Sequence, residues 1–262
     1  MTPACTKPES ASGPRPPRGP LWRLYERLAM VIGLGSLALM CLAWLPFAAL
    51  LYPILPRRAG QRLGRLVIMW SFRHYLLLLT IACGCRFDLR ALDALRRERG
   101  LIVAANHPSL LDAVVLVSRL PDAVCVMKAS LLDNLLFGAA ARLARYVRND
   151  GAHQLIKNGR NSLAEGAQVV LFPEGSRTSA FPLDALNPSL AVLAKRAQAP
   201  VQTVLLHYST PYLGKHWPLQ RPPVLPLTCT ARLGRRFAPP EDAQALTAEL
   251  QRYLRAELGA AP

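Results

Sequence analysis

The chain has 262 residues, of which 52% are hydrophobic, so it can bury a core and is not disordered as a whole. Its 32 basic and 16 acidic residues give a formal net charge of +16, and 27 of the basic residues are arginine. This excess predicts a partner rich in negative charge: nucleic acid, an anionic membrane surface or a phosphorylated substrate.

The distribution of charge separates these partners. Residues 1–87 hold eleven basic side chains against Glu9 and Glu26, and this segment is also the most hydrophobic part of the chain. A nucleic-acid-binding arm does not need uninterrupted apolar stretches, whereas a membrane anchor does. We therefore expect membrane lipids as partners and no nucleic acid.

Residues 1–27 are predicted to form a disordered basic tail. The first twenty are mostly Pro, Gly, Ser and Arg without periodicity. The apolar run begins only near Leu28, and no small-x-small cleavage site follows it. Removal of this segment as a secretory signal is therefore not expected.

Residues 28–86 are predicted to anchor the chain in a membrane. No charge occurs between Arg27 and Arg57, and these 29 residues would measure about 43 Å as a helix, long for one crossing and short for two. Basic residues flank both ends, which places both ends in the cytoplasm. A re-entrant hairpin that turns near Pro46 fits both facts; a single span is the alternative.

Residues 57–82 are predicted to form an interfacial helix. Apolar residues cover most of its surface, and one arc carries the basic side chains that would meet lipid phosphates, Arg58, Arg62, Arg65 and Arg73. A second full span would place Arg73 near the middle of the bilayer at about 3 kcal/mol. The alternative is a buried helix of a soluble core.

From residue 87 onward, short apolar runs alternate with longer helical patterns, which predicts an α/β fold over residues 87–262: a central mixed sheet layered by helices. Strands are expected at 101–105, 123–127, 169–172, 201–206 and 225–232. Helices are expected at 91–99, 110–120, 130–142, 152–165, 189–198 and 242–258.

The six cysteines are irregularly spaced, so we expect buried thiols in a reducing interior and no disulfide framework. Cys83 and Cys85 have no matching Cys/His pair at metal-ligand spacing. No metal site is expected.

A histidine follows the strand predicted at 101–105, at the end of the strand where open α/β sheets build their sites. Asp112 lies five residues after His107. A carboxylate on Nδ1–H holds the ring in one tautomer and leaves Nε2 free to accept a proton, as in a general base. A structural His–Asp pair is the alternative. The nucleophile motif G-x-S-x-G is absent, so the base is expected to activate a substrate hydroxyl.

A second polar loop follows the strand predicted at 169–172. Gly175 permits a tight turn, Ser176 adds a donor, and Arg177 can grip an oxyanion with two hydrogen bonds. Glu174 is expected to orient Arg177 or to bind a substrate hydroxyl. An ordinary polar turn is the alternative.

The motifs NHPSLLD (106–112) and FPEGSRT (172–178) resemble, in this order, the first and third blocks of the glycerolipid acyltransferases typified by 1-acylglycerol-3-phosphate acyltransferase. Residues 127–149 and 199–201 resemble two further blocks, so that the resemblance covers about residues 100–206. The membrane-seated N-terminal helices suit a bacterial member of this family.

The resemblance implies acyl transfer from the thioester of acyl-CoA or acyl-carrier protein to the hydroxyl of a lysophospholipid, above all 1-acylglycerol-3-phosphate, giving phosphatidate. His107 would be the base and Asp112 its orienting partner, with backbone N–H groups near His107 as the expected oxyanion donors. No cofactor is expected, and the catalytic domain would lie on the cytoplasmic side of the cell membrane. The residues expected at the substrate are Asn106, Lys128, Arg148, Glu174, Gly175, Ser176 and Arg177.

Two departures from the family pattern leave the acceptor open. Asp184 follows the third block where a basic residue is usual, and Leu135 stands where Pro is common. An ornithine-type, polyene or other specialised lipid acceptor is the first alternative, and a non-catalytic basic membrane-binding protein is the remote one. A further cluster, Arg232, Arg235 and Arg236, is expected to be solvated or to dock a carrier protein.

Overall fold

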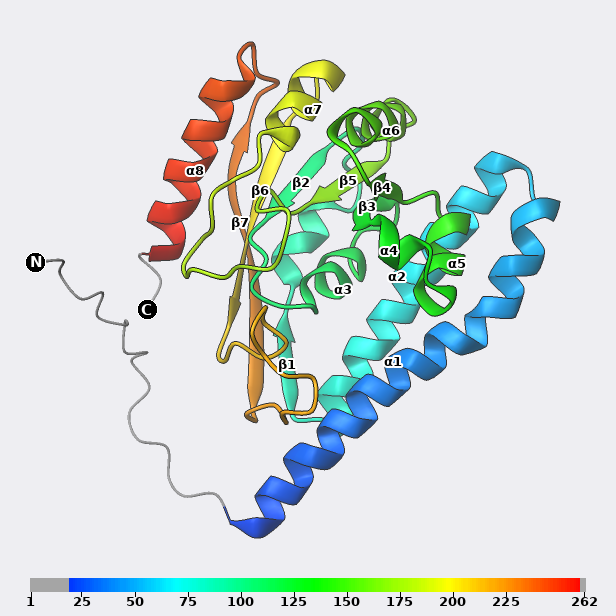
Figure 1. The fold of residues 1–262 in the computed structure, drawn as a ribbon, viewed down its shortest axis with the longest axis vertical. Helices are drawn as coiled ribbons and strands as arrows, with labels where there is room; N and C mark the ends of the chain where they lie inside the picture. The colour runs from blue at the N-terminus through cyan, green and yellow to red at the C-terminus, as the bar shows by residue number, and fades with distance from the viewer. Residues whose placement is uncertain (1–18, 260–262) are drawn as a thin grey trace, which may run out of the picture.

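The computed structural model of the protein describes residues 19–259, apart from the side chains of residues 135–137. Two long helices, α1 (Pro20–Ile54) and α2 (Arg57–Ala82), precede an α/β domain (Figure 1). The domain is built on a seven-stranded sheet in the order β1-β7-β6-β2-β5-β3-β4. Only β6 and β7 pair antiparallel, so the predicted mixed sheet is confirmed.

The strands are β1 (Cys85–Asp88), β2 (Ile102–Ala105), β3 (Ala123–Lys128), β4 (Val147–Asn149), β5 (Gln168–Leu171), β6 (Val201–Tyr208) and β7 (Leu227–Phe237). The remaining helices are the 3-10 helix η1 (Arg90–Leu95), α3 (Asp112–Val117), α4 (Ala129–Leu132), α5 (Leu135–Leu143), α6 (Ala152–Ala164), α7 (Ser189–Ala197) and α8 (Ala243–Gly259).

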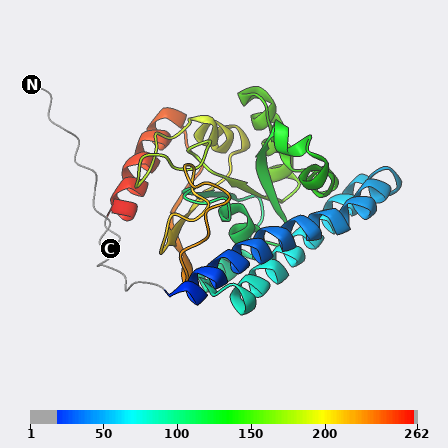
Figure 2. The same cartoon turned by 60° about the horizontal axis from the view of Figure 1, so that its bottom comes forward.

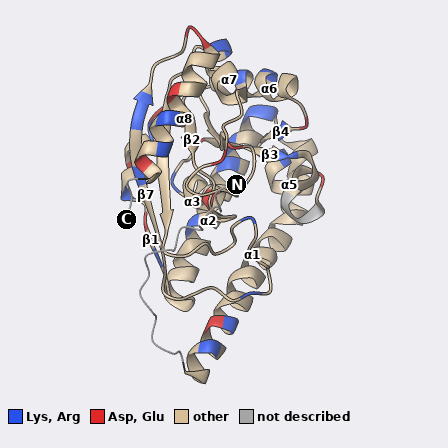
Figure 3. Ribbon diagram, turned by 60° about the vertical axis from the view of Figure 1, so that its left-hand side comes forward, with Lys and Arg blue, Asp and Glu red and all other residues tan. Residues whose placement is uncertain are grey.

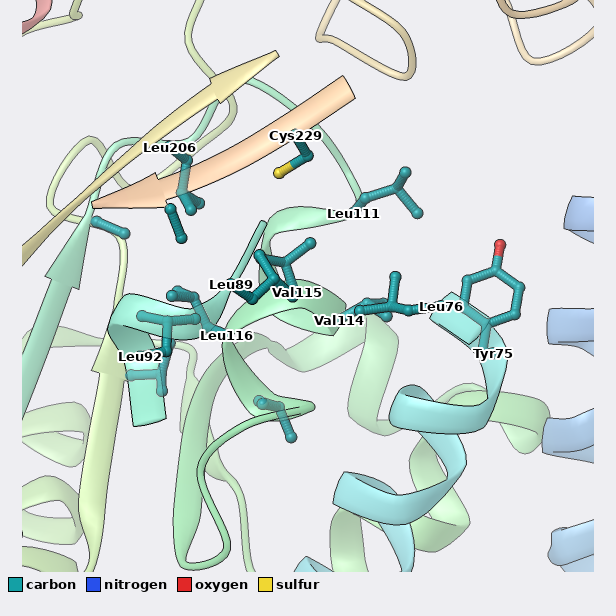
Figure 4. Close-up of a cluster of buried hydrophobic side chains, with 14 of the residues drawn as sticks. Tyr75, Leu76, Leu89, Leu92, Leu111, Val114, Val115, Leu116, Leu206 and Cys229 are labelled. Carbon is teal, nitrogen blue, oxygen red and sulfur yellow. The ribbon is translucent and has the colours of Figure 1, made fainter. Parts of the chain in front are cut away.

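Both faces of the sheet are covered, because successive side chains of a strand point to opposite sides. In β2, Val103 and Ala105 belong to one core cluster, and Ile102 and Ala104 belong to another. Helices α2 and α3 cover the first face, where Val114 packs near Leu76 (Figure 4). Helices α6, α7 and α8 cover the second face. The uninterrupted apolar sequence of β2 follows from this burial on both sides.

Some predicted elements are corrected by the structure. The helix expected at 130–142 is two helices, α4 and α5, separated at Asp133 and Asn134. The helix expected at 91–99 is only the short η1. Strands β1 and β4 were not predicted, because each is only three or four residues long and is exposed at every second position or at its end.

Helix α1 differs from its prediction at both ends. It begins at Pro20, so residues 20–27 are helical and not a tail; residues 1–18 lie outside the described part of the chain. The expected turn near Pro46 is wrong, because α1 continues through Pro46 and Pro53 and the chain turns only at Leu55 and Pro56. Packing of Trp44 and Ala48 against α5 offsets the hydrogen bond that Pro46 removes.

The two helices form an antiparallel hairpin along one side of the α/β domain (Figure 2). Near the free end of the hairpin the Tyr25 hydroxyl donates to the carbonyl of Ala82 at 3.2 Å. Acidic and basic positions lie next to each other near the start of α1 (Figure 3). The buried Glu26 of this helix accepts a hydrogen bond from the N–H of Leu225 just before β7. Helix α1 is thereby tied to both α2 and the sheet.

Helix α2 has the predicted bounds, but Arg65 does not face lipid. Its side chain is 4% exposed; Nη1 lies 2.6 Å from Asp122 Oδ1, and Nε donates to the carbonyl of Ala144 at 3.2 Å. Tyr75 and Leu76 on the same helix belong to the core of the domain. One face of helix α2 therefore packs in the core of the domain, and its other face is exposed.

The outward faces of the hairpin are apolar. Leu21, Leu24, Leu28, Val31, Leu39, Leu42, Leu50 and Ile54 follow a helical spacing along α1, and Leu63, Leu66, Trp70, Leu77 and Ile81 do so along α2. By length and composition each helix is apolar enough to cross a membrane. A continuous exposed apolar surface of this kind associates with a membrane. We call it the apolar stripe.

The close contact of α2 with α5 gives a testable prediction. A Cβ at Gly64 would lie 2.7 Å from the backbone N of Ala144, so Gly64→Ala must push the two helices apart. We expect a loss of about 1 to 3 kcal/mol in unfolding free energy, measured by thermal unfolding in detergent. Gly35→Ala on α1 is the control, because its Cβ meets no atom within 4 Å. Equal stability of the two variants would contradict this packing.

Candidate active site

Parallel strands bring the two polar motifs together. Strands β6, β2, β5 and β3 are neighbours and run in the same direction, so their carboxyl ends meet at one edge. His107 follows β2 and Glu174 follows β5. The N–H of Thr178 donates to the carbonyl of His107 at 2.7 Å, which joins the two loops directly.

His107 and Asp112 form the predicted pair. Their Nδ1 and Oδ2 atoms are 2.8 Å apart, and Asp112 is completely buried at the first turn of α3. His107 is partly exposed and lines a cavity of about 510 Å³, and no described residue bonds its Nε2 atom. Nδ1 of the ring is therefore held by Asp112, and Nε2 is free to contact a substrate in the cavity.

Phe172 holds the plane of this imidazole. The two rings stack with their centroids 3.9 Å apart and an angle of 14° between them. Phe172 begins the FPEGSRT motif, but no role was predicted for its side chain; the available signal is an aromatic residue directly after a strand that neighbours the histidine strand. Stacking restricts ring rotation and so keeps Nε2 directed at the cavity.

The surroundings of Asp112 are apolar except for a few donors. Oδ2 also accepts the N–H of Ser109 at 2.8 Å, while Oδ1 has no hydrogen-bond partner among the described residues. The buried Tyr208 hydroxyl lies near enough to interact with this carboxylate. Burial raises the pKa of Asp112, and the hydrogen bonds from His107 and Ser109 act in the opposite direction.

Glu174 does not pair with Arg177. Its Oε1 accepts the N–H of His107 and the hydroxyl of Thr178, both at 2.9 Å, and its Oε2 accepts the N–H of Asp184 at 3.0 Å. Burial raises the pKa of Glu174, and these bonds act to lower it. The carboxylate thus fastens the histidine loop to the residue 172–184 segment, and the expectation that it orients Arg177 is wrong.

The expected oxyanion donors near His107 are occupied. The N–H of His107 donates to Glu174, that of Ser109 to Asp112, and that of Leu110 to the carbonyl of Leu213. Pro108 has no N–H. The backbone of this loop is therefore used to hold its own shape.

Asn106 is also structural in this fold. Its side-chain nitrogen donates to the carbonyl of Leu206 at 2.9 Å, and its oxygen accepts the N–H of Leu206 at 2.8 Å. The amide extends the pairing between β2 and β6 beyond the last strand residue. Asn106 does not line the cavity, so its predicted contact with substrate finds no support in this geometry.

The loop after β5 supplies the polar wall of the cavity. Gly175 has φ +71°, a conformation that favours glycine, and it lines the cavity with Ser176 and Arg177. Arg177 Nη1 donates to the carbonyls of Leu213 at 2.8 Å and Gly214 at 3.0 Å. The other nitrogens of its guanidinium have no hydrogen-bond partner recorded among the described residues, and Arg177 lines the cavity.

The two basic residues of the intervening block have different surroundings. Lys128 ends β3 and lines the cavity. Arg148 does not line it: its Nη1 lies 2.6 Å from Asp133 and its Nε 2.6 Å from Asp150. Through these two ion pairs Arg148 links the end of α4 to the end of β4. This geometry does not favour its predicted contact with the substrate.

The cavity has an apolar part as well as a cationic one. Its apolar walls come from α2, α3, β3 and α4, with Phe72, Ala113, Val117, Cys125 and Leu131 among them. Its cationic side is formed by Lys128, Arg177 and Lys215. Lys215 lies between β6 and β7 and was not predicted, because no motif surrounds it.

The remaining clusters do not form a second site. Arg232, Arg235 and Arg236 pair with Glu257, Glu249 and Glu98, so the solvated reading of this patch is the one the structure favours. Within residues 19–259 no three His, Cys, Asp or Glu side chains gather in a way that could hold a metal ion.

A His–Asp pair at the carboxyl edge of a mixed sheet, beside a cavity that is partly apolar and partly cationic, defines a group-transfer enzyme for lipid substrates. Comparisons with known proteins agree. Residues 86–207 match the family model named Acyltransferase. This match and the two relatives described below support a glycerolipid acyltransferase family assignment and an O-acyltransferase activity for the chain.

Two relatives illustrate the range of the family. The 1-acyl-sn-glycerol-3-phosphate acyltransferase of Pseudomonas aeruginosa is 28% identical over 181 residues, which cover 67% of each chain. The lyso-ornithine lipid O-acyltransferase of Rhizobium meliloti is 33% identical over 156 residues, 56% of this chain and 52% of the relative.

A solved structure shares the fold. The 1-acyl-sn-glycerophosphate acyltransferase PlsC from Thermotoga maritima superposes with a TM-score of 0.67 at 14% identity. The match covers 90% of this chain and 96% of that structure, so it includes the helical hairpin as well as the sheet.

Proposed function

We propose that the protein transfers a fatty acyl group from acyl-CoA or acyl-carrier protein to the hydroxyl of 1-acylglycerol-3-phosphate, forming phosphatidate. The observation that carries this proposal is the His107–Asp112 pair at 2.8 Å, with the outer ring nitrogen open to a cavity that has cationic and apolar walls. The named activity of the Pseudomonas aeruginosa relative supports the choice of acceptor.

The reaction needs one proton relay. Nε2 of His107 accepts the proton of the acceptor hydroxyl as its oxygen attacks the thioester carbonyl. The new C–O bond forms, the C–S bond breaks, and the proton passes from His107 to the leaving thiolate. Asp112 stabilises the transient imidazolium through Nδ1. Holding both substrates in one cavity replaces a covalent intermediate.

The two sides of the cavity suit the two ends of these substrates. A cationic wall attracts a phosphate, and an apolar wall accepts an acyl chain without exposing it to water. Ser176, Arg177 and Lys128 are proposed as headgroup contacts, and Gly175 is proposed as the turn residue that presents Ser176 and Arg177. Glu174 is proposed as a positioning residue, because its bonds hold the backbone of His107.

The apolar stripe associates the protein with a membrane, and we propose that the catalytic domain faces the cytoplasm. Helix α2 packs against the domain at Arg65, Tyr75 and Leu76. A hairpin that crossed the bilayer would therefore draw the domain into it. The hairpin is proposed to lie along one leaflet, with its basic ends among lipid headgroups.

A second candidate keeps the chemistry and changes the acceptor. Asp184 stands where the family usually has a basic residue, and the relative with 33% identity is a lyso-ornithine lipid O-acyltransferase. An acceptor that carries an amino group would tolerate this carboxylate better than a phosphate does.

The test incubates the purified full-length protein with labelled acyl-CoA, or with acyl-carrier protein, and a panel of acceptors. We expect transfer to 1-acylglycerol-3-phosphate and its loss in His107→Ala. Transfer to a lyso-ornithine lipid with none to 1-acylglycerol-3-phosphate would select the second candidate. Undiminished transfer by His107→Ala would refute the mechanism.

A further inference from the structure

Lys215 brings a positive charge to the cavity. Its Nζ donates to the hydroxyl of Ser176 at 3.3 Å and to that of Ser179 at 2.5 Å. Lys215, Ser176 and Arg177 line the same cavity as His107. Both hydrogen-bond partners of the ammonium among the described residues are neutral hydroxyls, so no carboxylate bonds it directly and its donors can turn to a ligand.

This availability distinguishes Lys215 from other cations of the domain. Arg148 is bonded to two carboxylates and Arg65 to one. Among the cations that line the cavity, none has a carboxylate partner within the described part of the chain. Bonds from the N–H groups of Ala180 and Ser179 hold the pKa of Asp184 below its usual range, and the charge of Lys215 contributes to this lowering. Asp184 is therefore near enough to interact with the charge of Lys215, but no ion pair joins the two side chains among the described contacts.

The backbone that carries Lys215 is fastened to both motif loops. The carbonyl of Leu213 accepts the N–H of Leu110 at 3.1 Å and Nη1 of Arg177 at 2.8 Å. Arg177 also bonds the carbonyl of Gly214, the residue just before Lys215. Ser109 Oγ donates to the carbonyl of Tyr212. Lys215 therefore extends from a fixed support, which lowers the entropic cost of ligand binding.

We propose that Lys215 binds the phosphate of the acyl acceptor and sets the preference for an anionic headgroup; this rests on the proposed function. A phosphomonoester oxygen would replace the serine hydroxyls on Nζ, and Ser176 and Ser179 would then be free to donate to the phosphate. Arg177 fixes the turn that carries Lys215 and adds its remaining donors. Lys215 is a specificity-determining residue and takes no part in the proton transfer.

The experiment compares 1-acylglycerol-3-phosphate with a monoacylglycerol of the same chain, using acyl-CoA as donor and full-length protein in mixed micelles. For Lys215→Ala we expect the KM for the phosphate-bearing acceptor to rise by about tenfold to a hundredfold, the kcat to change little, and the KM for monoacylglycerol to stay unchanged. Lys215→Arg keeps most of the preference. Lys195→Ala, on α7 and outside the cavity, is the matched control.

The possible outcomes are distinct. An unchanged KM for 1-acylglycerol-3-phosphate in Lys215→Ala would overturn the assignment and leave the proposed function intact. An equal rise for both acceptors would overturn charge recognition, and a rise confined to the KM for acyl-CoA would assign the contact to a donor phosphate. Absence of transfer to any lysophospholipid by the unmodified protein would overturn the proposed function together with this inference.

Discussion

Asp112→Asn is expected to lower kcat by about a hundredfold to a thousandfold while the protein stays folded. The Asn oxygen can take the place of Oδ2 and still accept the N–H groups of Ser109 and His107. Its nitrogen would then take the place of Oδ1, which has no hydrogen-bond partner among the described residues. The substitution keeps the geometry and removes only the negative charge. The fall in kcat therefore measures how far Asp112 stabilises the imidazolium.

The measurement is kcat with saturating acyl-CoA and acceptor, together with thermal unfolding of each variant. Asp133→Asn is the control, since Asp133 is an exposed aspartate that pairs with Arg148 away from His107. A near-normal kcat in Asp112→Asn would mean that Asp112 serves the fold and not the reaction.

Asp122→Ala is expected to reduce the unfolding free energy by about 3 kcal/mol, more than Arg65→Met does. Arg65 is 4% exposed, and its Nη2 atom already has no partner among the described residues. Without Asp122 the guanidinium stays buried with only the carbonyl of Ala144. Arg65→Met removes the buried charge itself, and Asp122, which is 40% exposed, regains water.

The comparison is made by thermal unfolding in detergent, where the loss for Asp122→Ala corresponds to a fall of roughly 10 °C. Arg62→Met, on the exposed side of α2, should leave the midpoint unchanged. If Arg65→Met were the more damaging change, the attraction in this pair would exceed its desolvation cost. The hairpin would then be held to the domain chiefly by charge.

The sheet and the His107–Asp112 pair could be predicted because both depend on local pattern. Buried parallel strands have continuous apolar runs, and two motifs that follow neighbouring strands meet at one edge. The pair itself spans only five residues. Each strand, each motif and the His–Asp pair occupies only a few neighbouring residues, so the sequence of a single chain contains their signal.

Features that depend on tertiary contacts were beyond prediction. Pro46 lies inside α1 because α5, about ninety residues later, packs beside it. Arg148 and Lys128 looked alike as basic residues of one block, and only the positions of Asp133 and Asp150 separate them. Lys215 is held at the cavity by a turn whose carbonyls, at Leu213 and Gly214, accept hydrogen bonds from Arg177, and no residue type encodes such bonds.

Phe72 lies on α2, the helix that carries part of the apolar stripe, and it also lines the cavity. A lysolipid that enters beside Phe72 keeps its chain in apolar surroundings from leaflet to active site. Transfer through water would cost about 0.8 kcal/mol for every methylene. The rate of the enzyme should therefore depend on the density of acceptor within the two-dimensional leaflet, so that dilution with inert lipid slows it at constant bulk concentration.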